Sequence, residues 1–536
     1  MKRRTVLIGL DGATFSVLDP LMNQGIMPFL KEFLVTGARA QLRSVIPPLT
    51  PPAWTSLVTG RSPGNHGIFD FFLKEETGPH IRFATSADVR CETFWSMASR
   101  DGCHITVLNF PLMLPPPKVN GNVVAGGWMT PRQLRLGCRP EGLYDQIKAI
   151  PGFDPHRVVL NLAHEEKALE GCNLSEYDEW IRMHIERERQ WFNIASFLLR
   201  DEPSELTGIL FDGVDKIQHL CWRFLCPDAS QGPLSLREEE IRRECLLYFS
   251  KLDEMLAGIV TLAGPDATIF IASDHGFGAQ TETFFVNAWL AREGYLSWSD
   301  RERPRESENA VLGMRQLARH VYMLDWDKTR AYAATPSSNG IHVVPANGSS
   351  KAGVPTGEYA AFREELIQAL CGVTSPGTGQ RVVKQIWTRE EAFAGPFMRI
   401  APDLTLCLRD GGLVSILDSD EPVKPRKMPS GTHRPEGVFM ARGPGIHRGL
   451  CADELSILDV APTLLYSLDL PIPAEMEGRV SEDLFLRTHL ENHPPKFQTL
   501  RDSARTPKKG IGDNLLFDAE AEAEMAARLR AWGYIE

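Results

Sequence analysis

Residues 5–13 read TVLIGLDGA, a mostly apolar run that ends at an aspartate and a glycine. The basic residues before it, KRR at positions 2–4, resemble the start of a signal peptide. The run is only six residues long, and Asp11 ends it without a small-residue cleavage site. A short apolar run of this kind is typical of a buried strand. We therefore predict that Thr5–Leu10 is the first strand of a sheet.

Similar runs recur along the chain, and continuous apolar runs are typical of buried parallel strands. The predicted strands are Thr5–Leu10, His104–Asn109, Gly121–Ala125, Leu206–Phe211, Ala267–Ala272, Gly340–Val344, Asp403–Leu408 and Gly437–Ala441. Amphipathic stretches lie between many of them, for example Pro28–Thr36, Ser175–Leu199, Glu238–Ala263 and Gly357–Cys371. This alternation predicts an α/β fold with a doubly wound, mostly parallel sheet sandwiched by helices.

Two parts of the chain depart from the alternation. Residues 130–205 are helix-rich and charged, and residues 281–400 mix short elements with polar loops rich in Gly and Pro. We predict that both are cap-like insertions in one catalytic domain over residues 1–480. Residues 481–536 are predicted to be a C-terminal tail that ends in an amphipathic helix, EAEAEMAARLRAWGYIE.

Composition limits the classes of partner. The 536 residues are 43% hydrophobic and 24% charged, as in an ordinary globular protein, and the net charge is −11. An acidic chain is not expected to bind a nucleic-acid polymer or an anionic membrane surface. No run approaches the roughly 20 apolar residues of a membrane-spanning helix. The ten cysteines form no CxxC pair, which favours free thiols in a reducing cytoplasm.

Residues 46–60 read IPPLTPPAWTSLVTG and place Thr50 among four prolines. Proline fixes its own φ and pushes the preceding residue toward extended geometry, so Thr50 is strongly restricted. Two interpretations are open from this stretch alone. It is either a rigid turn between a strand and a helix, or a nucleophile held at a helix N-terminus.

Acidic and histidine side chains follow several predicted strands, at the sheet edge where open α/β folds bind ligands. Asp215 and His219 have i, i+4 spacing and share one face of a helical turn. Asp212 competes with Asp215 for the position after its strand. The full candidate set is Asp11, Asp215, His219, Asp274, His275 and His433.

Carboxylate and imidazole groups suit zinc and similar divalent ions. For each residue alone, a turn, a helix cap or a core position is the simpler interpretation. Six ligands are too many for one tetrahedral ion, however, and four separate segments supply them. The set therefore predicts two divalent ions, with the Thr50 hydroxyl joining one of them.

Together these segments resemble the alkaline phosphatase superfamily, and within it the type I phosphodiesterase/nucleotide pyrophosphatase branch. The matching pieces, in the family's order, are LIGLDGA, LTPPAWTSLVTGRSPGNHGI, DKIQH, SDHGF, GTHRPEGVF and SILDVAPTLLYSLDLPIPAEMEGR. They extend from residue 5 to about residue 480.

The resemblance implies a threonine nucleophile and two metal sites. Asp11, Thr50, Asp274 and His275 would hold one ion, and Asp215, His219 and His433 the other. It implies zinc, with manganese or other divalent ions as alternatives, and a covalent phosphothreonine that is later hydrolysed. Metal coordination lowers the pKa of a threonine hydroxyl enough to make it a nucleophile.

Residues that differ from the superfamily's motifs narrow the classes of substrate that we expect. The arginine of a sulfatase CxPxR-type motif is absent from TPPAW, and no arginine lies between Arg43 and Arg61 to grip a monoester phosphate. A phosphodiester is therefore the favoured substrate. Phe71 stands where the nucleotide pyrophosphatases have a phosphate-binding asparagine. Asn109 could replace it as a substrate-binding residue, or could cap a turn.

Three classes of function remain open at this point. The first is a metal-dependent phosphodiesterase, or a phosphohydrolase more broadly, including a phosphomonoesterase. The second is a phosphotransferase or mutase on the same scaffold, like cofactor-independent phosphoglycerate mutase. The third is a binding protein that kept the fold and lost turnover, which the intact ligand set argues against. The sequence predicts a small phosphoester substrate without naming it, and leaves the oligomeric state open.

Overall fold

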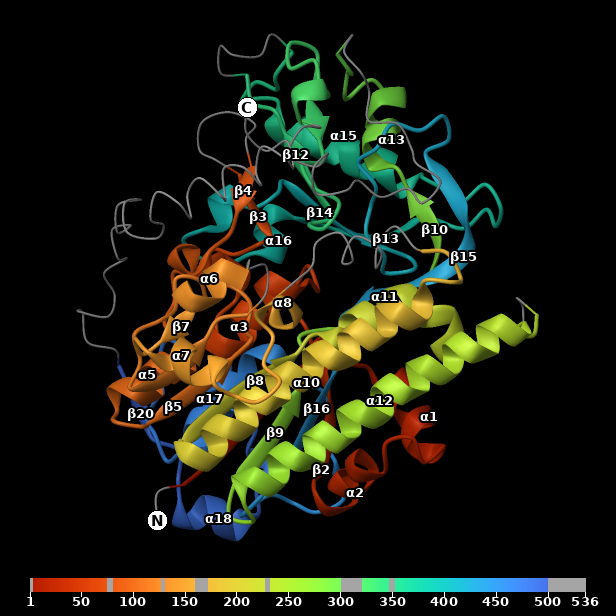
Figure 1. The fold of residues 1–536 in the computed structure, drawn as a ribbon. Coiled ribbons are helices and arrows are strands. Elements are labelled where there is room, and N and C mark those ends of the chain that lie inside the picture. Colours follow the sequence, from red (N-terminus) through yellow and green to blue (C-terminus); the bar gives the residue numbers. More distant parts are fainter. Residues whose placement is uncertain are drawn as a thin grey trace.

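The computed structural model describes residues 3–74, 81–126, 131–159, 172–226, 232–299, 321–346 and 352–499. Within these residues there are two large hydrophobic cores, one around a large sheet and one in a smaller part of the molecule. Figure 1 shows the arrangement of the helices and strands. The helix predicted over residues 520–536 lies outside the described residues.

Ten strands form the large sheet within the described residues. They are β1 (Thr5–Leu10), β2 (Ala38–Arg43), β5 (Ile105–Leu108), β6 (Gly121–Val124), β7 (Cys138–Arg139), β8 (Leu206–Phe211), β9 (Thr268–Ala272), β16 (Glu436–Arg442), β17 (Leu450–Cys451) and β18 (Leu455–Ser456). The order is β17-β2-β16-β9-β1-β8-β5-β6-β7, and β18 also pairs with β2. The central strands β9, β1, β8, β5 and β6 are parallel to one another.

The predicted fold class is confirmed, and all eight predicted runs are strands. The orientation was wrong for three of them. The run over Gly437–Ala441 lies in β16, which is antiparallel to both of its neighbours. The runs over Gly340–Val344 and Asp403–Leu408 pair antiparallel in a separate sheet. A short apolar run indicates a strand that is buried on both faces of its sheet. It does not indicate whether the neighbouring strand is parallel or antiparallel.

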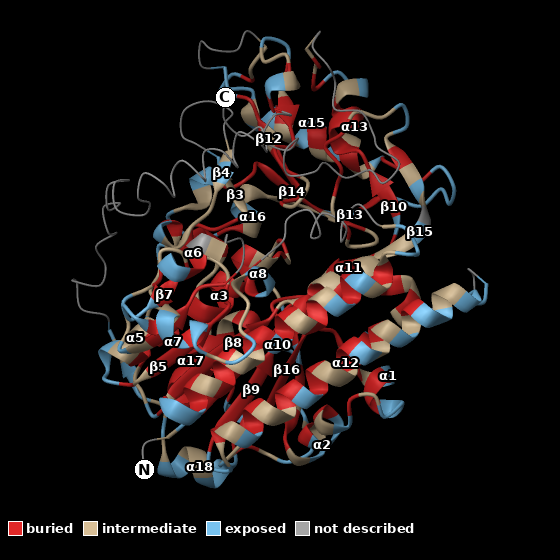
Figure 2. Ribbon diagram, in the orientation of Figure 1, coloured by how far each residue is buried: buried red, intermediate tan, exposed pale blue. Residues whose placement is uncertain are grey.

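Helices flank the large sheet in two packed groups. The first is α1 (Phe15–Asn23), α2 (Pro28–Thr36), α10 (Tyr177–Asp201), α11 (Gly213–Leu225) and α12 (Leu236–Ala263). The second is α3 (Thr50–Thr59), α4 (Pro63–His66), α5 (Phe94–Arg100) and α17 (Val460–Ser467). Figure 2 shows the inward faces of α10 and α12 buried and their outward faces exposed, as expected of amphipathic helices.

The smaller core has its own sheet, of order β11-β12-β14-β13. Its elements are β11 (Ala331–Tyr332), β12 (Gly340–Val343), β13 (Val383–Thr388), β14 (Leu404–Leu408), α13 (Val286–Arg292), α15 (Tyr359–Cys371) and α16 (Arg389–Ala392). A two-stranded ribbon, β10 (Gly276–Phe284) with β15 (Val423–Arg434), connects it to the large sheet (Figure 1).

The two predicted insertions pack differently. Helix α10, from the segment 130–205, packs against α12 and buries Trp180 and Trp191 in the larger core. The smaller core, in contrast, consists of residues between Phe284 and Val423. The division into a catalytic domain over 1–480 and a tail over 481–536 stays a prediction.

The remaining elements are short. They are α6 (Pro131–Leu136), α7 (Leu143–Lys148), α8 (Pro155–Val158), α18 (Arg487–Asn492), β3 (Phe72–Lys74), β4 (Ile81–Phe83), β19 (Ile472–Pro473) and β20 (Phe497–Gln498), with 3₁₀ turns at Ser86–Asp88, Val321–Met323, Met398–Ile400, Ile457–Asp459 and Glu482–Leu484. Among the helices that the structure describes, none combines the length and apolarity needed to cross a bilayer.

Candidate active site

Thr50 is the first residue of α3, and the two prolines after it occupy the first turn of that helix. Proline suits this position because its missing N–H has no helical acceptor and its φ is already helical. The rest of α3 is buried, whereas Thr50 is half-buried. Its Oγ1 lies 3.4 Å from Nε2 of His275. The prolines therefore hold one partly accessible hydroxyl at a fixed point beside the histidine.

The exit of β1 carries Asp11 and Gly12. Oδ2 of Asp11 accepts a hydrogen bond from Nε1 of Trp54 on α3, at 3.2 Å. Gly12 has a φ of +67°, and a Cβ there would lie 2.6 Å from the ring of Phe277. Its N–H donates to Oδ1 of Asp274 at 3.1 Å. Only glycine fits this turn, which brings the Asp11 and Asp274 segments together.

His275 follows Asp274 at the exit of β9. Its Nε2 is 3.3 Å from Oδ2 of Asp274 and 3.6 Å from Oδ1 of Asp11. Ligand atoms of Asp11, Asp274 and His275 all lie within 4.8 Å of one another, and the three residues are buried. They form the first acidic cluster.

Asp215 and His219 lie one turn apart on α11, and His433 reaches them from β15. Oδ1 of Asp215 is 3.4 Å from Nε2 of His219 and 3.3 Å from Nε2 of His433. The second acidic cluster within 4.8 Å consists of Asp215, His433 and His275. His275 therefore lies between both clusters, although the resemblance assigns it to the first ion only.

Each histidine is oriented by its other ring nitrogen. The three Nδ1 atoms lie 3.0–3.2 Å from backbone carbonyl oxygens, those of Gly431 for His219, Pro48 for His433 and Gly276 for His275. A carbonyl oxygen only accepts, so each Nδ1 donates and each ring directs its Nε2 into the site. The Nε2 atoms of His219 and His433 are 3.0 Å apart.

Charge is crowded in this buried space. Burial and the negative charges of Asp274 and Asp215 raise the pKa of Asp11 well above its usual range. Burial would also raise the pKa of Asp215, but His219 and Lys216 hold it well below its usual range. Burial lowers the pKa of His275 and of His433, which keeps both rings neutral.

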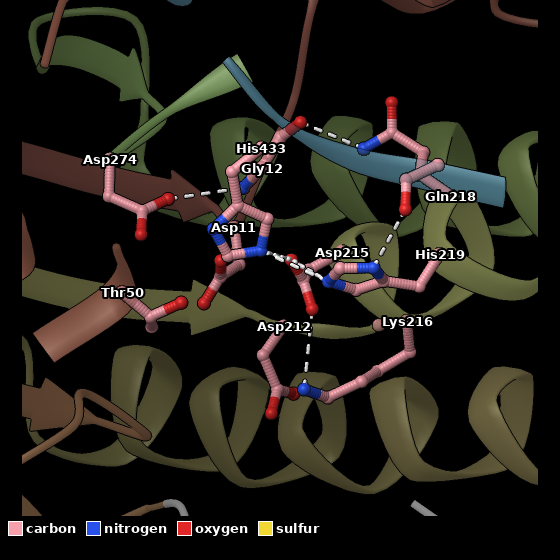
Figure 3. Close-up of polar contacts among 12 residues, drawn as sticks. Asp11, Gly12, Thr50, Asp212, Asp215, Lys216, Gln218, His219, Asp274 and His433 are labelled. Carbon is pink, nitrogen blue, oxygen red and sulfur yellow. Dashed lines mark hydrogen bonds and ion pairs between the residues drawn. The ribbon is translucent and has the colours of Figure 1, made fainter. Parts of the chain in front are cut away.

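The carboxylate and imidazole groups of this site are suitable ligands for divalent cations. Among the described residues, Oδ1 of Asp11, Oδ1 of Asp215 and Oδ2 of Asp274 are buried without a hydrogen-bond partner. Leaving such acceptors unpaired costs free energy. Figure 3 shows Thr50, Asp11 and Asp215 directed toward a common centre with the rings of His219 and His433. Carboxylate oxygens and imidazole lone pairs converging there are the ligands of zinc and related ions.

The chain matches a known family over most of its length. The model described as "Type I phosphodiesterase / nucleotide pyrophosphatase" matches residues 5–436. The chain belongs to the type I phosphodiesterase/nucleotide pyrophosphatase family. The predicted enzyme class, a hydrolase acting on phosphoric ester bonds, is thereby confirmed. The family is metal-dependent, and the two acidic clusters are the candidate metal sites.

Two solved structures have similar folds. Inactive murine ectonucleotide pyrophosphatase/phosphodiesterase 5, in complex with AMP, is 14% identical with a TM-score of 0.49; the match covers 90% of this chain and 100% of that one. Phosphonoacetate hydrolase from Sinorhizobium meliloti 1021, in complex with phosphonoacetate, is 16% identical with a TM-score of 0.50; the match covers 87% of this chain and 95% of that one. At this identity, the match to the hydrolase supports the fold alone.

Asn109, the predicted substrate-binding residue, lies buried at the end of β5 with a φ of +64°. Its Nδ2 donates to the carbonyl of Leu210 at 2.9 Å and to Oδ1 of Asp212 at 3.5 Å. Asp212, which is partly buried, also forms an ion pair with the buried Arg187 of α10, at 3.0 Å. Both amide hydrogens of Asn109 are thus engaged with protein acceptors, and its role toward substrate stays a prediction.

Three residues of the site escaped the sequence analysis. Trp54 donates to Asp11, and Gln218 donates to the carbonyl of Gly12 at 2.8 Å. Nζ of Lys216 lies 3.3 Å from Oδ2 of Asp215. All three lie inside quoted segments, TPPAW and DKIQH. Helical spacing from Thr50 and from Asp215 could have pointed to Trp54 and Gln218, but not to Lys216, which directly follows Asp215.

Proposed function

We propose that this chain is a metal-dependent phosphodiesterase that acts through a covalent phosphothreonine on Thr50. One observation carries the proposal: the Thr50 hydroxyl lies 3.4 Å from Nε2 of His275, the imidazole shared by both acidic clusters. A partly accessible hydroxyl beside buried metal-type ligands is the arrangement expected of an activated nucleophile.

We propose two divalent ions, most simply zinc, with manganese or a similar ion as the alternative. Asp11, Thr50, Asp274 and His275 would hold one, and Asp215, His219 and His433 the other. When bound, such ions lower the pKa of a ligating hydroxyl and stabilise charge on the phosphoryl group and the leaving oxygen. His275 contacts both clusters in the structure, so its imidazole could serve either ion.

The reaction is a double displacement at phosphorus. The Thr50 hydroxyl gives up its proton, and Oγ1 bonds to phosphorus while the bond to the leaving-group oxygen breaks. That oxygen takes a proton and leaves as an alcohol. Water then attacks phosphorus, the bond to Oγ1 breaks, and the threonine hydroxyl is restored. The prolines after Thr50 support both steps because they keep Oγ1 in one position throughout.

A diester is the favoured substrate because the nucleophile loop supplies no phosphate-gripping arginine. Arg61, the first arginine after Thr50, pairs instead with Glu477 at 3.4 Å. The net charge of −11 argues for a small phosphoester over a nucleic-acid polymer. All ten cysteines are free thiols, in keeping with the predicted cytoplasmic location. The smaller core is our candidate for the cap that selects the leaving group.

The test is metal analysis combined with a hydrolysis screen. Purified protein is assayed for bound metal, and then with aryl phosphodiester, phosphomonoester and sulfate probes. We expect two metals per chain and diester turnover that falls at least about 1,000-fold in Thr50→Ala. Thr50→Ser should keep part of the activity because it keeps a hydroxyl. Thr261→Ala, on the exposed face of α12, is the matched surface control.

Acid quenching during diester turnover should trap a phosphoryl group that still carries its second ester substituent on the wild-type chain, and none on Thr50→Ala. Full diester activity in Thr50→Ala would refute the mechanism. A stable phosphoprotein that transfers its phosphate to an added acceptor without releasing phosphate would support the phosphotransferase alternative instead.

A further inference from the structure

The turn between β8 and α11 contacts a buried carboxylate that the proposed reaction does not use, that of Glu188 on α10. Its Oε1 accepts a hydrogen bond from the N–H of Gly213, the first residue of α11, at 2.6 Å. The same oxygen accepts a hydrogen bond from the hydroxyl of Tyr248 on α12, at 3.2 Å. One side chain therefore joins the start of α11 to the two long helices that pack beside it.

We propose that Glu188 is a positioning residue for Asp215 and His219, the two candidate metal ligands on α11, and that it acts by fixing the first turn of that helix. This inference rests on the proposed function, which assigns a divalent ion to these two ligands and His433. Asp215 lies in the same first turn as Gly213. A shift of that turn would therefore move Oδ1 of Asp215, which lies 3.4 Å from Nε2 of His219 and 3.3 Å from Nε2 of His433.

The start of α11 needs an acceptor from outside the helix. The first N–H groups of a helix have no acceptor within it, and the side chain of the preceding residue commonly supplies one. Here that residue is Asp212, and its side chain makes no such bond. It is engaged instead by Arg187 at 3.0 Å and by the amide of Asn109 at 3.5 Å. Glu188 supplies the acceptor from another helix.

Glycine at position 213 leaves room for this carboxylate. A Cβ there would lie 2.5 Å from Oε1 of Glu188 and 2.6 Å from the hydroxyl oxygen of Tyr248. Both distances are too short for a methyl group, so any other residue would displace one of the two side chains. The backbone of α11 can approach the carboxylate this closely only because residue 213 has no side chain.

The surroundings of Glu188 favour positioning over a gain in stability as its role. Its Oε2 is buried without a hydrogen-bond partner among the residues that the structure describes. An unpaired buried oxygen costs free energy, so an acid is a poor choice here for stability alone. Burial and the negative charge of Asp212 raise the pKa of Glu188, which favours its neutral form. Glutamine, which is uncharged and keeps an oxygen acceptor, is therefore a close replacement.

The chain contains a matched contact outside the site. Asp253, a buried acid on α12, accepts hydrogen bonds from the N–H groups of Phe29 and Leu30 at the start of α2, at 2.8 and 2.9 Å. Helix α2 carries none of the candidate metal ligands. Loss of Asp253 should therefore destabilise the protein in the same way as loss of Glu188, without changing how metal binds.

The experiment compares Glu188→Ala, Glu188→Gln and Gly213→Ala with the control Asp253→Ala, all in the full chain. Zinc binding to each metal-free protein is titrated by calorimetry, and hydrogen exchange of the α11 amides is measured on the same metal-free samples. Urea unfolding gives the stability of each variant, and kcat/KM for an aryl diester is measured with zinc bound. Gly213→Ala disturbs the same contact from the helix side, so it supplies the test if Glu188→Ala does not fold.

We expect Glu188→Ala and Gly213→Ala to weaken one of the two zinc sites by about 10-fold and to leave the other unchanged. Amides in the first turn of α11 should exchange faster in both variants. Glu188→Gln should bind zinc as wild type does, and Asp253→Ala should lose stability while keeping wild-type zinc affinity. Unchanged zinc affinity in either Glu188→Ala or Gly213→Ala, once folded, would overturn the inference. An equal loss of zinc affinity in Asp253→Ala would also overturn it, because the effect would then follow stability.

The inference and the proposed function fail in different ways. If the wild-type chain hydrolyses diesters but Glu188→Ala binds both zinc ions as tightly as wild type, the inference falls and the function stands. If the wild-type chain hydrolyses no ester but Glu188→Ala weakens one zinc site, the function falls and the positioning role stands.

Discussion

At the scale of single residues, the candidate site contains groups that orient its proposed metal ligands. The Nδ1 atoms of His219 and His433 donate to carbonyls 212 residues later and 385 residues earlier in the chain, respectively. These bonds fix both the ring orientation and the tautomer, so Nε2 needs no rearrangement to act as a ligand. Trp54 does the same for Asp11 by donating to Oδ2, which leaves Oδ1 for a cation.

Trp54→Phe should weaken metal binding by about 10- to 100-fold, because the positioning of Asp11 loses its donor. Titration of the metal-free variant with zinc, read by calorimetry, measures this. Trp289→Phe makes the same change in the smaller core and should leave zinc affinity unchanged. Equal zinc affinity in Trp54→Phe and wild type would show that packing alone positions Asp11.

At the scale of elements, local patterns predicted which side chains lie together better than they predicted the pairing of strands. Asp11, Asp274 and His275 were found because they follow apolar runs, and a strand exit is a local feature. The direction of β16 was missed because it depends on the β10–β15 ribbon, a contact between segments more than 100 residues apart. Lys216 and the Arg187–Asp212 pair were missed for the same reason, since nothing in DKIQH fixes which acids surround the lysine.

Helix α3 offers a test of the role of its prolines. Pro51→Ala restores an N–H and frees the backbone of Thr50, so the unfolded chain gains entropy and Thr50 is less fixed in the native state. We expect a loss of about 0.4–1 kcal/mol in the free energy of unfolding, and a lower kcat with metal content unchanged. Urea unfolding and steady-state kinetics measure the two effects. An unchanged kcat would mean that the metals alone position the hydroxyl.

At the scale of the whole molecule, the two cores meet at a second place besides the ribbon. Asp70, just after α4, is buried and accepts hydrogen bonds from Thr335, at 2.5 Å, and Ser337, at 2.6 Å, in the loop between β11 and β12. The carboxylate of Asp70 thus links the segment after α4 to the smaller core. Burial raises its pKa to about 6, although these hydroxyl donors oppose the rise.

This carboxylate should make stability depend on pH. The native state binds the Asp70 proton more tightly than the unfolded state, whose pKa is near 3.8. The contribution of Asp70 to the stability of the folded form is therefore largest below about pH 4, and is lost as pH rises to about 6, by up to about 3 kcal/mol. An amide side chain cannot ionise, so the Asp70→Asn variant should not lose stability in this way as pH rises.

Urea unfolding of wild type and Asp70→Asn at several values between pH 4 and pH 7 isolates the effect, because other groups titrate in both proteins. We expect the free energy of unfolding of Asp70→Asn to increase relative to that of wild type as pH rises. The difference between the two proteins should become constant above about pH 6. Asp420→Asn, on the exposed surface, supplies the baseline. A difference that stays constant with pH would mean that Asp70 keeps its charge in the folded protein, stabilised by the hydroxyls of the smaller core.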